Sequence, residues 1–165
     1  MNALGIPLDY GKARGLQPQA EATRLVSIGA NPDGRDISLE PAAAAAWARM
    51  RDAAAADGRA LVAISGFRSV KRQDEIIRGR LSKGERIDAI LRTMAAPGYS
   101  EHHTGRAIDL GAPGEPLLTE GFSLTREFAW LVDHAHEYGF RLSYPRDNTH
   151  GIAFEPWHWC FVAQV

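Results

Sequence analysis

The sequence predicts an α+β domain in which helices flank a central antiparallel sheet. Apolar stretches at residues 60–64, 106–110, 140–144 and 157–162 have the length of strands, and segments with helical periodicity lie among them. The last two stretches are joined by the turn-rich residues 145–151, which is typical of antiparallel neighbours. With 165 residues, of which 45% are hydrophobic, the chain can bury one core, so we expect a single domain.

The N-terminal part differs from the rest in composition. Residues 1–37 are rich in glycine and proline, which predicts an extended, irregular lead-in with one short strand near residues 24–28. The sequence Asn-Pro-Asp-Gly at residues 31–34 indicates a turn. We therefore divide the chain into a lead-in, residues 1–37, and a main domain, residues 38–165.

The first helix is expected from Pro41 to Asp57. Proline suits the first position of a helix, alanine dominates the segment, and Gly58 lies where a C-terminal cap belongs. Residues 60–64 follow as a short apolar run between glycines, which predicts a buried strand. This strand leads into Ser-Gly-Phe-Arg, so Arg68 is expected on a loop just beyond a rigid element.

Two helices are expected between this strand and the next. One covers about residues 70–81, and a second ends at Pro97. A third amphipathic helix is predicted over residues 125–138, with Gly139 at its cap. The second helix is predicted from apolar residues at helical spacing, namely Ile87, Ile90, Leu91 and Met94.

Composition and charge exclude several classes of function. A formal net charge of -1 gives no electrostatic reason to expect a nucleic acid or an anionic membrane as partner. No apolar run approaches the roughly 18 residues of a membrane span. The N-terminus lacks the features of a secretory signal, which predicts a cytoplasmic protein, or one of the periplasm or cell envelope if another route exports it. The single cysteine, Cys160, excludes an internal disulfide, and a monomer is expected.

Two short segments contain the residue types of a catalytic zinc site. Residues 100–109 read Ser-Glu-His-His-Thr-Gly-Arg-Ala-Ile-Asp, and residues 155–159 read Glu-Pro-Trp-His-Trp. A hydrolytic zinc centre needs three protein ligands, a fourth position open to water, and a nearby base. The candidates for these roles are His102, Asp109, His158 and Glu155.

These residues also have structural interpretations. A His-His pair in a loop is often solvated surface, an aspartate beside glycine often caps a turn, and Trp-His-Trp on a strand can simply place two tryptophans in the core. Against this, Asp109 is expected on a strand and His102 on the loop before it, and Gly105 allows the bend that brings them together. The joint occurrence favours a metal site, although the residues alone leave both interpretations open.

The remaining histidines and Arg68 carry weaker signals. His134 and His136 lie two apart on a predicted helix, so they point in different directions, do not form an i, i+4 metal pair, and are expected at the surface. His103 and His150 are interpreted as surface residues or as residues that line a cleft. Arg68 can clamp a carboxylate or stabilise an oxyanion, or it can form a salt bridge to a nearby acid.

Three segments together resemble the zinc D-alanyl-D-alanine carboxypeptidase family that includes the VanY type. They are Ser-Gly-Phe-Arg-Ser at residues 65–69, Ser-x-His-x-x-Gly-x-Ala-x-Asp at residues 100–109, and Glu-x-Trp-His at residues 155–158. Their order and spacing match the family throughout. The resemblance covers roughly residues 60–162, and it implies that residues 38–165 form a zinc peptidase catalytic domain.

The resemblance implies a peptidase that removes a terminal D-alanine from bacterial peptidoglycan stem peptides or their precursors, with D,D specificity preferred over L,D. It implies one Zn²⁺ per chain, held by His102, Asp109 and His158, with Glu155 as catalytic base. Arg68 matches the family arginine that steadies the polarised carbonyl or the substrate carboxylate. The other residues expected at the substrate are Gln73, Ser100 and Trp157.

The sequence departs from the family at a few positions, and alternatives follow. Cys160 stands where many relatives carry a basic residue, and His103 replaces a more common amide. A peptidoglycan endopeptidase of the endolysin type uses similar motifs, and the breadth of the cleft would decide between the two. A non-catalytic zinc-containing cell-wall binding module is disfavoured because Glu155 and Arg68 are present. A hydrolase with a Cys160 nucleophile is the outside interpretation.

Overall fold

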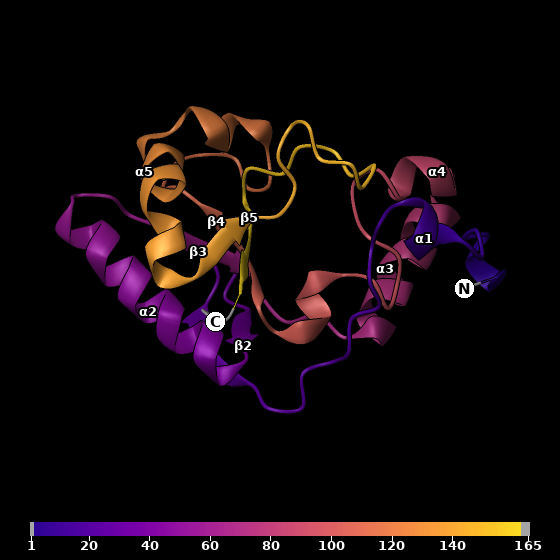
Figure 1. Cartoon of the computed structure of the whole chain (residues 1–165), viewed down its shortest axis with the longest axis horizontal. Helices are drawn as coiled ribbons and strands as arrows, with labels where there is room; N and C mark the ends of the chain where they lie inside the picture. The colour runs from indigo at the N-terminus through magenta and orange to yellow at the C-terminus, as the bar shows by residue number, and fades with distance from the viewer. Residues whose placement is uncertain (1, 163–165) are drawn as a thin grey trace.

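The computed structural model describes residues 2–162, and a four-stranded antiparallel sheet lies at its centre. In order across the sheet, its strands are β3 (Val62–Ser65), β4 (Ala107–Gly111), β6 (His158–Phe161) and β5 (Phe140–Leu142). β4 is buried along its whole length and pairs with β3 on one side and β6 on the other. Helices pack beside the sheet (Figure 1), so the predicted α+β fold is confirmed.

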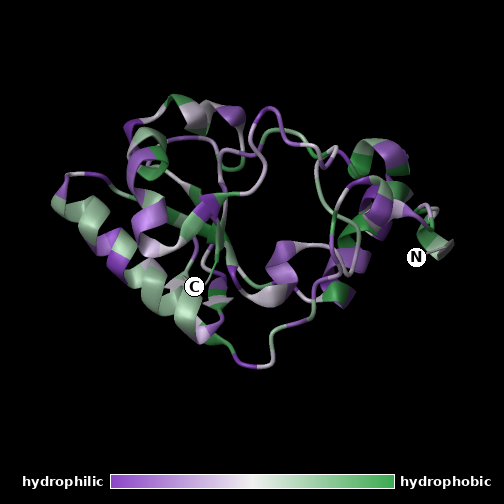
Figure 2. Ribbon diagram, viewed as in Figure 1, coloured by the Kyte–Doolittle hydropathy of each residue, from purple (hydrophilic) through white to green (hydrophobic). Residues whose placement is uncertain are grey.

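The largest of the three hydrophobic cores in the described part of the chain lies between the sheet and the helices beside it. These are α2 (Pro41–Ala56), α5 (Arg126–His134), and the short 3₁₀ helices η3 (Glu120–Leu124) and η4 (Ala135–Tyr138). Apolar residues are concentrated at the centre of this half of the molecule (Figure 2). Each large apolar side chain buried there stabilises the fold by about 1.5–3 kcal/mol. The largest fully buried ones are Leu39, Met50, Ile108, Leu110, Phe122, Leu131 and Phe140.

The helix predicted over residues 125–138 is divided into α5 and η4. It begins where predicted, because the Thr125 hydroxyl accepts a hydrogen bond from the Phe128 N–H and caps the helix. Its last turn is a 3₁₀ turn, which is common at the C-terminus of a helix. The end is also as predicted, since Gly139 adopts a left-handed conformation with φ 81°.

A second, smaller core lies on the far side of the molecule from α2 (Figure 1). It is formed by the N-terminal η1 (Asn2–Leu4) and α1 (Tyr10–Ala13) together with α3 (Val70–Ser82) and α4 (Ile87–Ile90). The Ser69 hydroxyl caps α3 by accepting from the Arg72 N–H. The buried members of this core are Leu4, Ile6, Tyr10, Ile77, Ile90, Leu91 and Ala96.

The predicted helix that ends at Pro97 is wrong in its second half. α4 ends at Ile90, and the chain continues as turns although Leu91 and Met94 keep helical spacing. The Ile90 carbonyl accepts hydrogen bonds from both the N–H and the hydroxyl of Thr93. Such local side-chain bonds compete with helix propagation, so the chain leaves the helical path here.

The lead-in is more ordered than predicted. Its strand is β1 (Val26–Ala30), which forms an antiparallel hairpin with β2 (Asp36–Leu39) across the predicted turn. The turn is held by Asn31, whose side-chain oxygen accepts from the Asp33 and Arg35 N–H groups. The two short helices η1 and α1 are not predicted from the sequence, because their apolar residues are buried only through contacts with distant parts of the chain.

The hairpin is joined to the end of β3. The Asn31 amide donates to the Ile64 carbonyl, and the Phe67 N–H donates to the Ser38 carbonyl. β2 therefore runs across position 37, where the predicted boundary between lead-in and catalytic domain lies. Residue 1 of the lead-in and residues 163–165 of the predicted domain lie outside the described residues. No helix within residues 2–162 combines the length and hydropathy that a bilayer crossing requires.

Candidate active site

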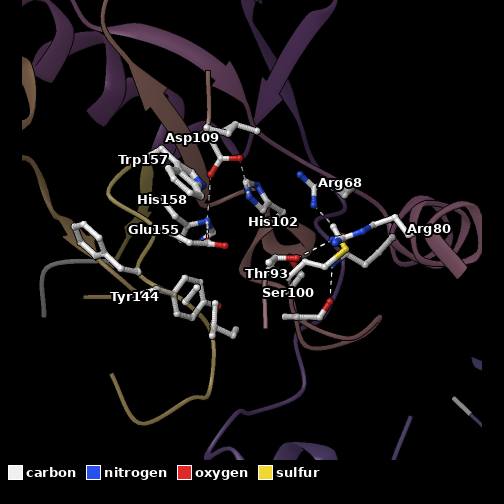
Figure 3. A pocket seen from close by; sticks show the side chains of 17 residues that line it. Arg68, Arg80, Thr93, Ser100, His102, Asp109, Tyr144, Glu155, Trp157 and His158 are labelled. Carbon is white, nitrogen blue, oxygen red and sulfur yellow. Dashed lines mark hydrogen bonds and ion pairs between the residues drawn. The ribbon is translucent and has the colours of Figure 1, made fainter. Parts of the chain in front are cut away.

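A cavity of about 320 Å³ separates the sheet from the α3–α4 half of the molecule (Figure 3). One wall comes from the middle of β4 and the loop that leads into β6, and the opposite wall from α3 and the segment after α4. All the residues that the sequence analysis proposed for the site line this cavity. They are Arg68, Gln73, Ser100, His102, Asp109, Glu155, Trp157 and His158.

His102, Asp109 and His158 converge in one wall of the cavity (Figure 3). His102 lies in the short 3₁₀ helix η2 (Glu101–Thr104), and the other two are register partners on β4 and β6. One ligand atom from each residue lies within 4.8 Å of the others, and all three residues are buried. The Asp109 carboxylate lies between the imidazoles, with Oδ2 3.3 Å from His102 Nε2 and Oδ1 3.2 Å from His158 Nδ1.

This donor set fits a zinc ion. Two imidazole nitrogens and one carboxylate oxygen are the kind of ligands that Zn²⁺ takes in catalytic sites, which leave a fourth position for water. The three residues line an open cavity, so a fourth position can remain accessible. The group could therefore hold one metal ion, as the sequence analysis predicted.

The backbone fixes the orientation of His102. Its Nδ1 lies 2.7 Å from the Gly66 carbonyl, to which the Nδ1–H donates, so Nε2 faces Asp109 and is free for a metal. Gly66 is required for this contact, because a Cβ at this position would lie 2.6 Å from the Ser38 carbonyl oxygen. Burial lowers the pKa of His102 and so favours the neutral, metal-binding form.

His158 lies between two carboxylates. Its Nδ1 faces Asp109, while Nε2 lies 3.0 Å from Oε2 of Glu101. The ring of Tyr144 packs against the imidazole, with 4.9 Å between the ring centroids. Burial by itself lowers the pKa of His158, but hydrogen bonds and charges from Asp109 and Glu101 outweigh it and raise the pKa to about 10. A metal bound at Nδ1 would therefore displace a proton.

The pKa values of Asp109 and Glu101, the two carboxylates beside His158, are lowered. Burial acts to raise the pKa of each, but the neighbouring imidazoles hold the pKa of Asp109 well below its usual range. For Glu101 the hydrogen bond and charge of His158, together with Ser143 and Arg141, outweigh burial and lower the pKa to about 2. Both groups are therefore carboxylates at neutral pH, as a cation site requires.

Glu155 differs from both of these carboxylates. It lies in the loop before β6, and its backbone N–H donates to the Tyr144 carbonyl. Its Oε2 is 3.9 Å from His158 Nδ1, and it is not part of the three-residue ligand group. Burial, reinforced by the charge of Asp109, raises the pKa of Glu155 to about 7. A carboxyl group with a pKa near neutrality can accept a proton and return it.

Arg68 lies on the loop between β3 and α3, beside His102 (Figure 3). Its guanidinium donates to Gln73 Oε1 at 3.0 Å and to Ser65 Oγ at 3.4 Å. Gln73 is fully buried, and its amide nitrogen donates to the Ala95 carbonyl at 2.6 Å. Both ends of the Gln73 amide are thus engaged, so this residue holds the guanidinium in place.

The remaining predicted residues have less specific surroundings. Ser100 is buried immediately before η2 and lines the cavity. Trp157 is half-buried, and it lines the cavity while also packing against the larger core. Trp159, two residues further along, lies in that core. The alternation along β6 therefore places Trp159 on the core side of the sheet and His158 on the cavity side.

His103 and Cys160 are buried structural residues. His103 is fully buried, with Nδ1 bonded to the Arg68 carbonyl and Nε2 accepting from the Gly98 N–H, so its interpretation as a surface or cleft residue is wrong. It supports the loop that carries Arg68. Burial raises the pKa of the Cys160 thiol well above its usual value, which disfavours the thiolate that a nucleophile needs. His134 is paired with Glu137 outside the cavity.

Two further residues of the site were missed by the sequence analysis. Glu101 touches His158, and Tyr144 packs on the same imidazole and lines the cavity. Glu101 directly precedes His102 within the first motif, and Tyr144 lies in the loop before the second. Neither position alone indicates a contact with His158, because that contact depends on how β4, β5 and β6 pair.

Comparison with known proteins identifies a family model that matches residues 36–164. Its description is "VanY: D-alanyl-D-alanine carboxypeptidase". Among curated proteins, the chain is similar to the putative carboxypeptidase YodJ of Bacillus subtilis, with 39% identity over 126 residues. The match covers 74% of this chain and 45% of YodJ, so the chain spans less than half the length of that relative.

Two solved structures are similar over most of the chain. One is the LdcB LD-carboxypeptidase, with a TM-score of 0.76 and 35% identity, covering 87% of this chain and 70% of the other. The second is a mutant of the vancomycin-resistance D,D-pentapeptidase VanY in complex with Zn(II). Its TM-score is 0.68 with 28% identity, and it covers 89% of this chain and 84% of the other. A zinc ion in this relative agrees with the donor set formed by His102, Asp109 and His158.

Proposed function

Because this chain belongs to the VanY family of D-alanyl-D-alanine carboxypeptidases, we propose that it is a zinc-dependent carboxypeptidase. Its substrates are bacterial peptidoglycan stem peptides or their precursors, from which it removes a terminal D-alanine. The observation that carries the proposal is the meeting of three features around one cavity: the His-Asp-His group, the buried Glu155, and the cationic Arg68.

Each residue has a role that its surroundings support. His102, Asp109 and His158 would hold the zinc ion. Zinc in such a site lowers the pKa of a bound water toward about 7 and polarises a carbonyl oxygen. Glu155 accepts a proton from the attacking water and delivers it to the leaving amino group. Because water is the nucleophile, no covalent acyl-enzyme is formed. Arg68 offsets the negative charge that develops on the carbonyl oxygen, or binds the substrate carboxylate.

Arg68 also favours an exopeptidase over an endopeptidase. Its guanidinium is held by Gln73 and Ser65, both neutral partners, and it forms no ion pair with an acid among the described residues. A fixed cation beside the metal group suits the free carboxylate of a C-terminal residue, which an internal peptide bond lacks. Gln73 acts through Arg68, whereas Ser100 and Trp157 line the remaining substrate surface.

Two specificities are in question for the terminal D-alanine. We propose D,D specificity, in line with the description of the family. L,D specificity is a second candidate, because the chain is similar to the LdcB LD-carboxypeptidase with a TM-score of 0.76. The two activities differ in the residue that precedes the released D-alanine, so substrates of defined length distinguish them.

The test is mass spectrometry of products after the zinc-loaded protein is incubated with pentapeptide and tetrapeptide muropeptides, with and without a chelator. Chelator-sensitive loss of one alanine from the pentapeptide alone is the expected result for D,D specificity. Loss from the tetrapeptide would establish the L,D activity. Internal cleavage fragments would identify an endopeptidase, and intact substrates with zinc bound would favour a binding module.

A further inference from the structure

The residue just before the first candidate ligand has a role that the motifs do not assign. We propose that Glu101 is a positioning residue for His158: its carboxylate accepts the Nε2–H of the imidazole, so that Nδ1 is the nitrogen presented to the metal. This inference rests on the proposed function in one respect, because it takes the His-Asp-His group as the metal site. It concerns a residue outside that group.

Each ring nitrogen of His158 has one hydrogen-bond partner. Glu101 Oε2 lies 3.0 Å from Nε2, and Asp109 Oδ1 lies 3.2 Å from Nδ1. Since Asp109 is itself a candidate ligand, the nitrogen beside it is the one that faces the metal position. A ligating histidine commonly donates its other N–H to a carboxylate, which fixes the tautomer and the ring orientation. Glu101 occupies that place.

The Glu101 carboxylate is fixed by burial and by hydrogen bonds, so it can orient the His158 ring. Its side chain is only 14% exposed, and both carboxylate oxygens have protein partners. Oε1 accepts from the Arg141 guanidinium at 2.6 Å, and Oε2 accepts from the Ser143 hydroxyl at 2.6 Å as well as from His158. Arg141 lies on β5, and Ser143 follows the end of that strand. The edge strand β5 thereby supports the imidazole through Glu101.

The two candidate histidine ligands are thus oriented in different ways. The Nδ1–H of His102 donates to a backbone carbonyl, which leaves its Nε2 for the metal. The Nε2–H of His158 donates to a side-chain carboxylate, which leaves Nδ1. A carbonyl cannot be removed by a side-chain substitution, whereas the carboxylate can. His158 is therefore the ligand whose orientation a single substitution at position 101 should disturb.

The experiment measures zinc affinity by competition with a chromogenic chelator for the whole chain and for the variants Glu101→Gln and Glu101→Ala. We expect Glu101→Ala to weaken zinc binding about 10- to 100-fold, the range for loss of such a partner. Glu101→Gln keeps a neutral acceptor of the same size and should rescue part of the loss. The absorption spectrum of the Co²⁺-substituted protein should change in Glu101→Ala, because the ligand field responds to a reoriented imidazole.

Glu137→Ala is the matched control. Glu137 accepts from another histidine, His134, at 2.9 Å, but this pair is exposed and lies outside the cavity. It should leave zinc affinity and the Co²⁺ spectrum unchanged. Ser143→Ala removes one of the groups that hold Glu101 and should weaken zinc binding less than Glu101→Ala does.

The possible outcomes separate this inference from the proposed function. Zinc affinity and a Co²⁺ spectrum equal to those of the unmodified chain in both Glu101 variants would overturn the role of Glu101 and leave the proposed function standing. Failure of the unmodified chain to bind zinc would overturn both. If Glu101→Ala does not fold, Glu101→Met decides, because methionine fills similar space without an oxygen acceptor for the His158 Nε2–H, and an unchanged zinc affinity in this variant contradicts the inference.

Discussion

At the scale of single residues, the site contains carboxyl groups that are similarly buried but differ in the direction of their pKa shifts. Asp109, Glu101 and Glu155 are all carboxyl groups with little exposure, yet only Glu155 has a raised pKa. The first two have imidazole partners at hydrogen-bond distance, whereas Glu155 is 3.9 Å from His158 Nδ1. Hydrogen bonds from imidazoles, joined for Glu101 by those from Ser143 and Arg141, thus separate the two groups that remain charged from Glu155, whose pKa is set mainly by burial.

A first prediction concerns this proton-accepting role. Glu155→Gln should lower turnover of a muropeptide substrate by about 10²- to 10⁴-fold, the usual contribution of a general base. Zinc affinity should stay near that of the unmodified chain, because Glu155 is outside the ligand group. Steady-state kinetics and chelator competition measure the two quantities. His102→Ala should instead lose both zinc and activity.

The control for this experiment is Glu75→Gln on the exposed side of α3, where Glu75 pairs with Arg72. This change should affect neither quantity. A Glu155→Gln variant with nearly normal turnover would remove Glu155 from the mechanism.

The ligand and base candidates could be predicted from the sequence because their residue types, order and spacing occur together. Glu101 could not, since nothing in the sequence states that the residue beside His102 contacts a histidine 57 positions later. Gln73 was placed at the site, but its action through Arg68 depends on an anchor at the Ala95 carbonyl. Backbone partners of this kind leave no mark on the sequence.

At the scale of elements, the turn between η2 and β4 sets the relation of His102 to Asp109. Gly105 ends η2 with φ 66°, in the left-handed region that glycine adopts without strain. Its carbonyl accepts from the Glu40 N–H at 2.8 Å, which ties the turn to the start of α2. A Cβ at this position would lie 2.9 Å from that same nitrogen. The bend is predicted from the sequence, whereas the contact with Glu40, a second reason for glycine, is not.

A second prediction follows for Gly105→Ala. The strained φ and the close backbone contact should lower the free energy of unfolding by about 1–3 kcal/mol. Zinc affinity should fall as well, because the turn sets the spacing of two ligands. Gly79→Ala is the control, since Gly79 lies in α3 with no atom within 4 Å of an added Cβ. Replacing this helical glycine should raise stability by about 0.5–1 kcal/mol.

Chemical denaturation and chelator competition on both glycine variants make this comparison. Equal stability of Gly105→Ala and the unmodified chain would contradict the assigned role of the turn.

Some helices and strands could be predicted from the sequence and others could not, for physical reasons. The four strands of the central sheet and α3 were predicted because their local sequence signals agree, whereas β2 was not predicted. α4 ends early because Thr93 bonds to the Ile90 carbonyl, which periodicity does not report. The short helices at the N-terminus contain too few residues for a periodic signal, and they are stabilised by the second core.

At the scale of the whole molecule, the N-terminal segment packs into the second core and bonds to the segment that follows α4. Tyr10 is buried, and its hydroxyl oxygen accepts from the Ala96 N–H at 3.1 Å, 86 residues along the chain. Its ring meets Tyr99 edge to face, and Arg14 stacks over it. Ala96 lies between α4 and the first metal motif, so this contact links the start of the chain to the cavity wall.

A third prediction concerns alkaline pH. Burial raises the pKa of Tyr10, and this outweighs the opposing effect of the Ala96 hydrogen bond. A raised pKa in the folded state means that the stability from neutral Tyr10 is complete below the unfolded pKa of about 10 and is lost as the pH rises through the folded value. At pH 7, Tyr10→Phe should cost about 1–3 kcal/mol, because the Ala96 N–H loses its acceptor. Above pH 10 the difference between the two proteins should shrink.

Urea unfolding between pH 7 and pH 11 measures this change. Tyr138→Phe serves as control, because Tyr138 is only half-buried at the end of η4. A constant difference between Tyr10→Phe and the unmodified chain across this range would contradict the buried, neutral state of Tyr10.

The hairpin of β1 and β2 bears on how the protein can be divided for laboratory work. The family model begins at residue 36, which is the first residue of β2. A recombinant fragment started there would discard β1, expose the edge of β2, and lose Asn31, whose amide binds the end of β3. An open strand edge invites pairing between molecules. A fragment that keeps the cavity walls in register must therefore begin before Val26, and retaining the second core requires Leu4 as well.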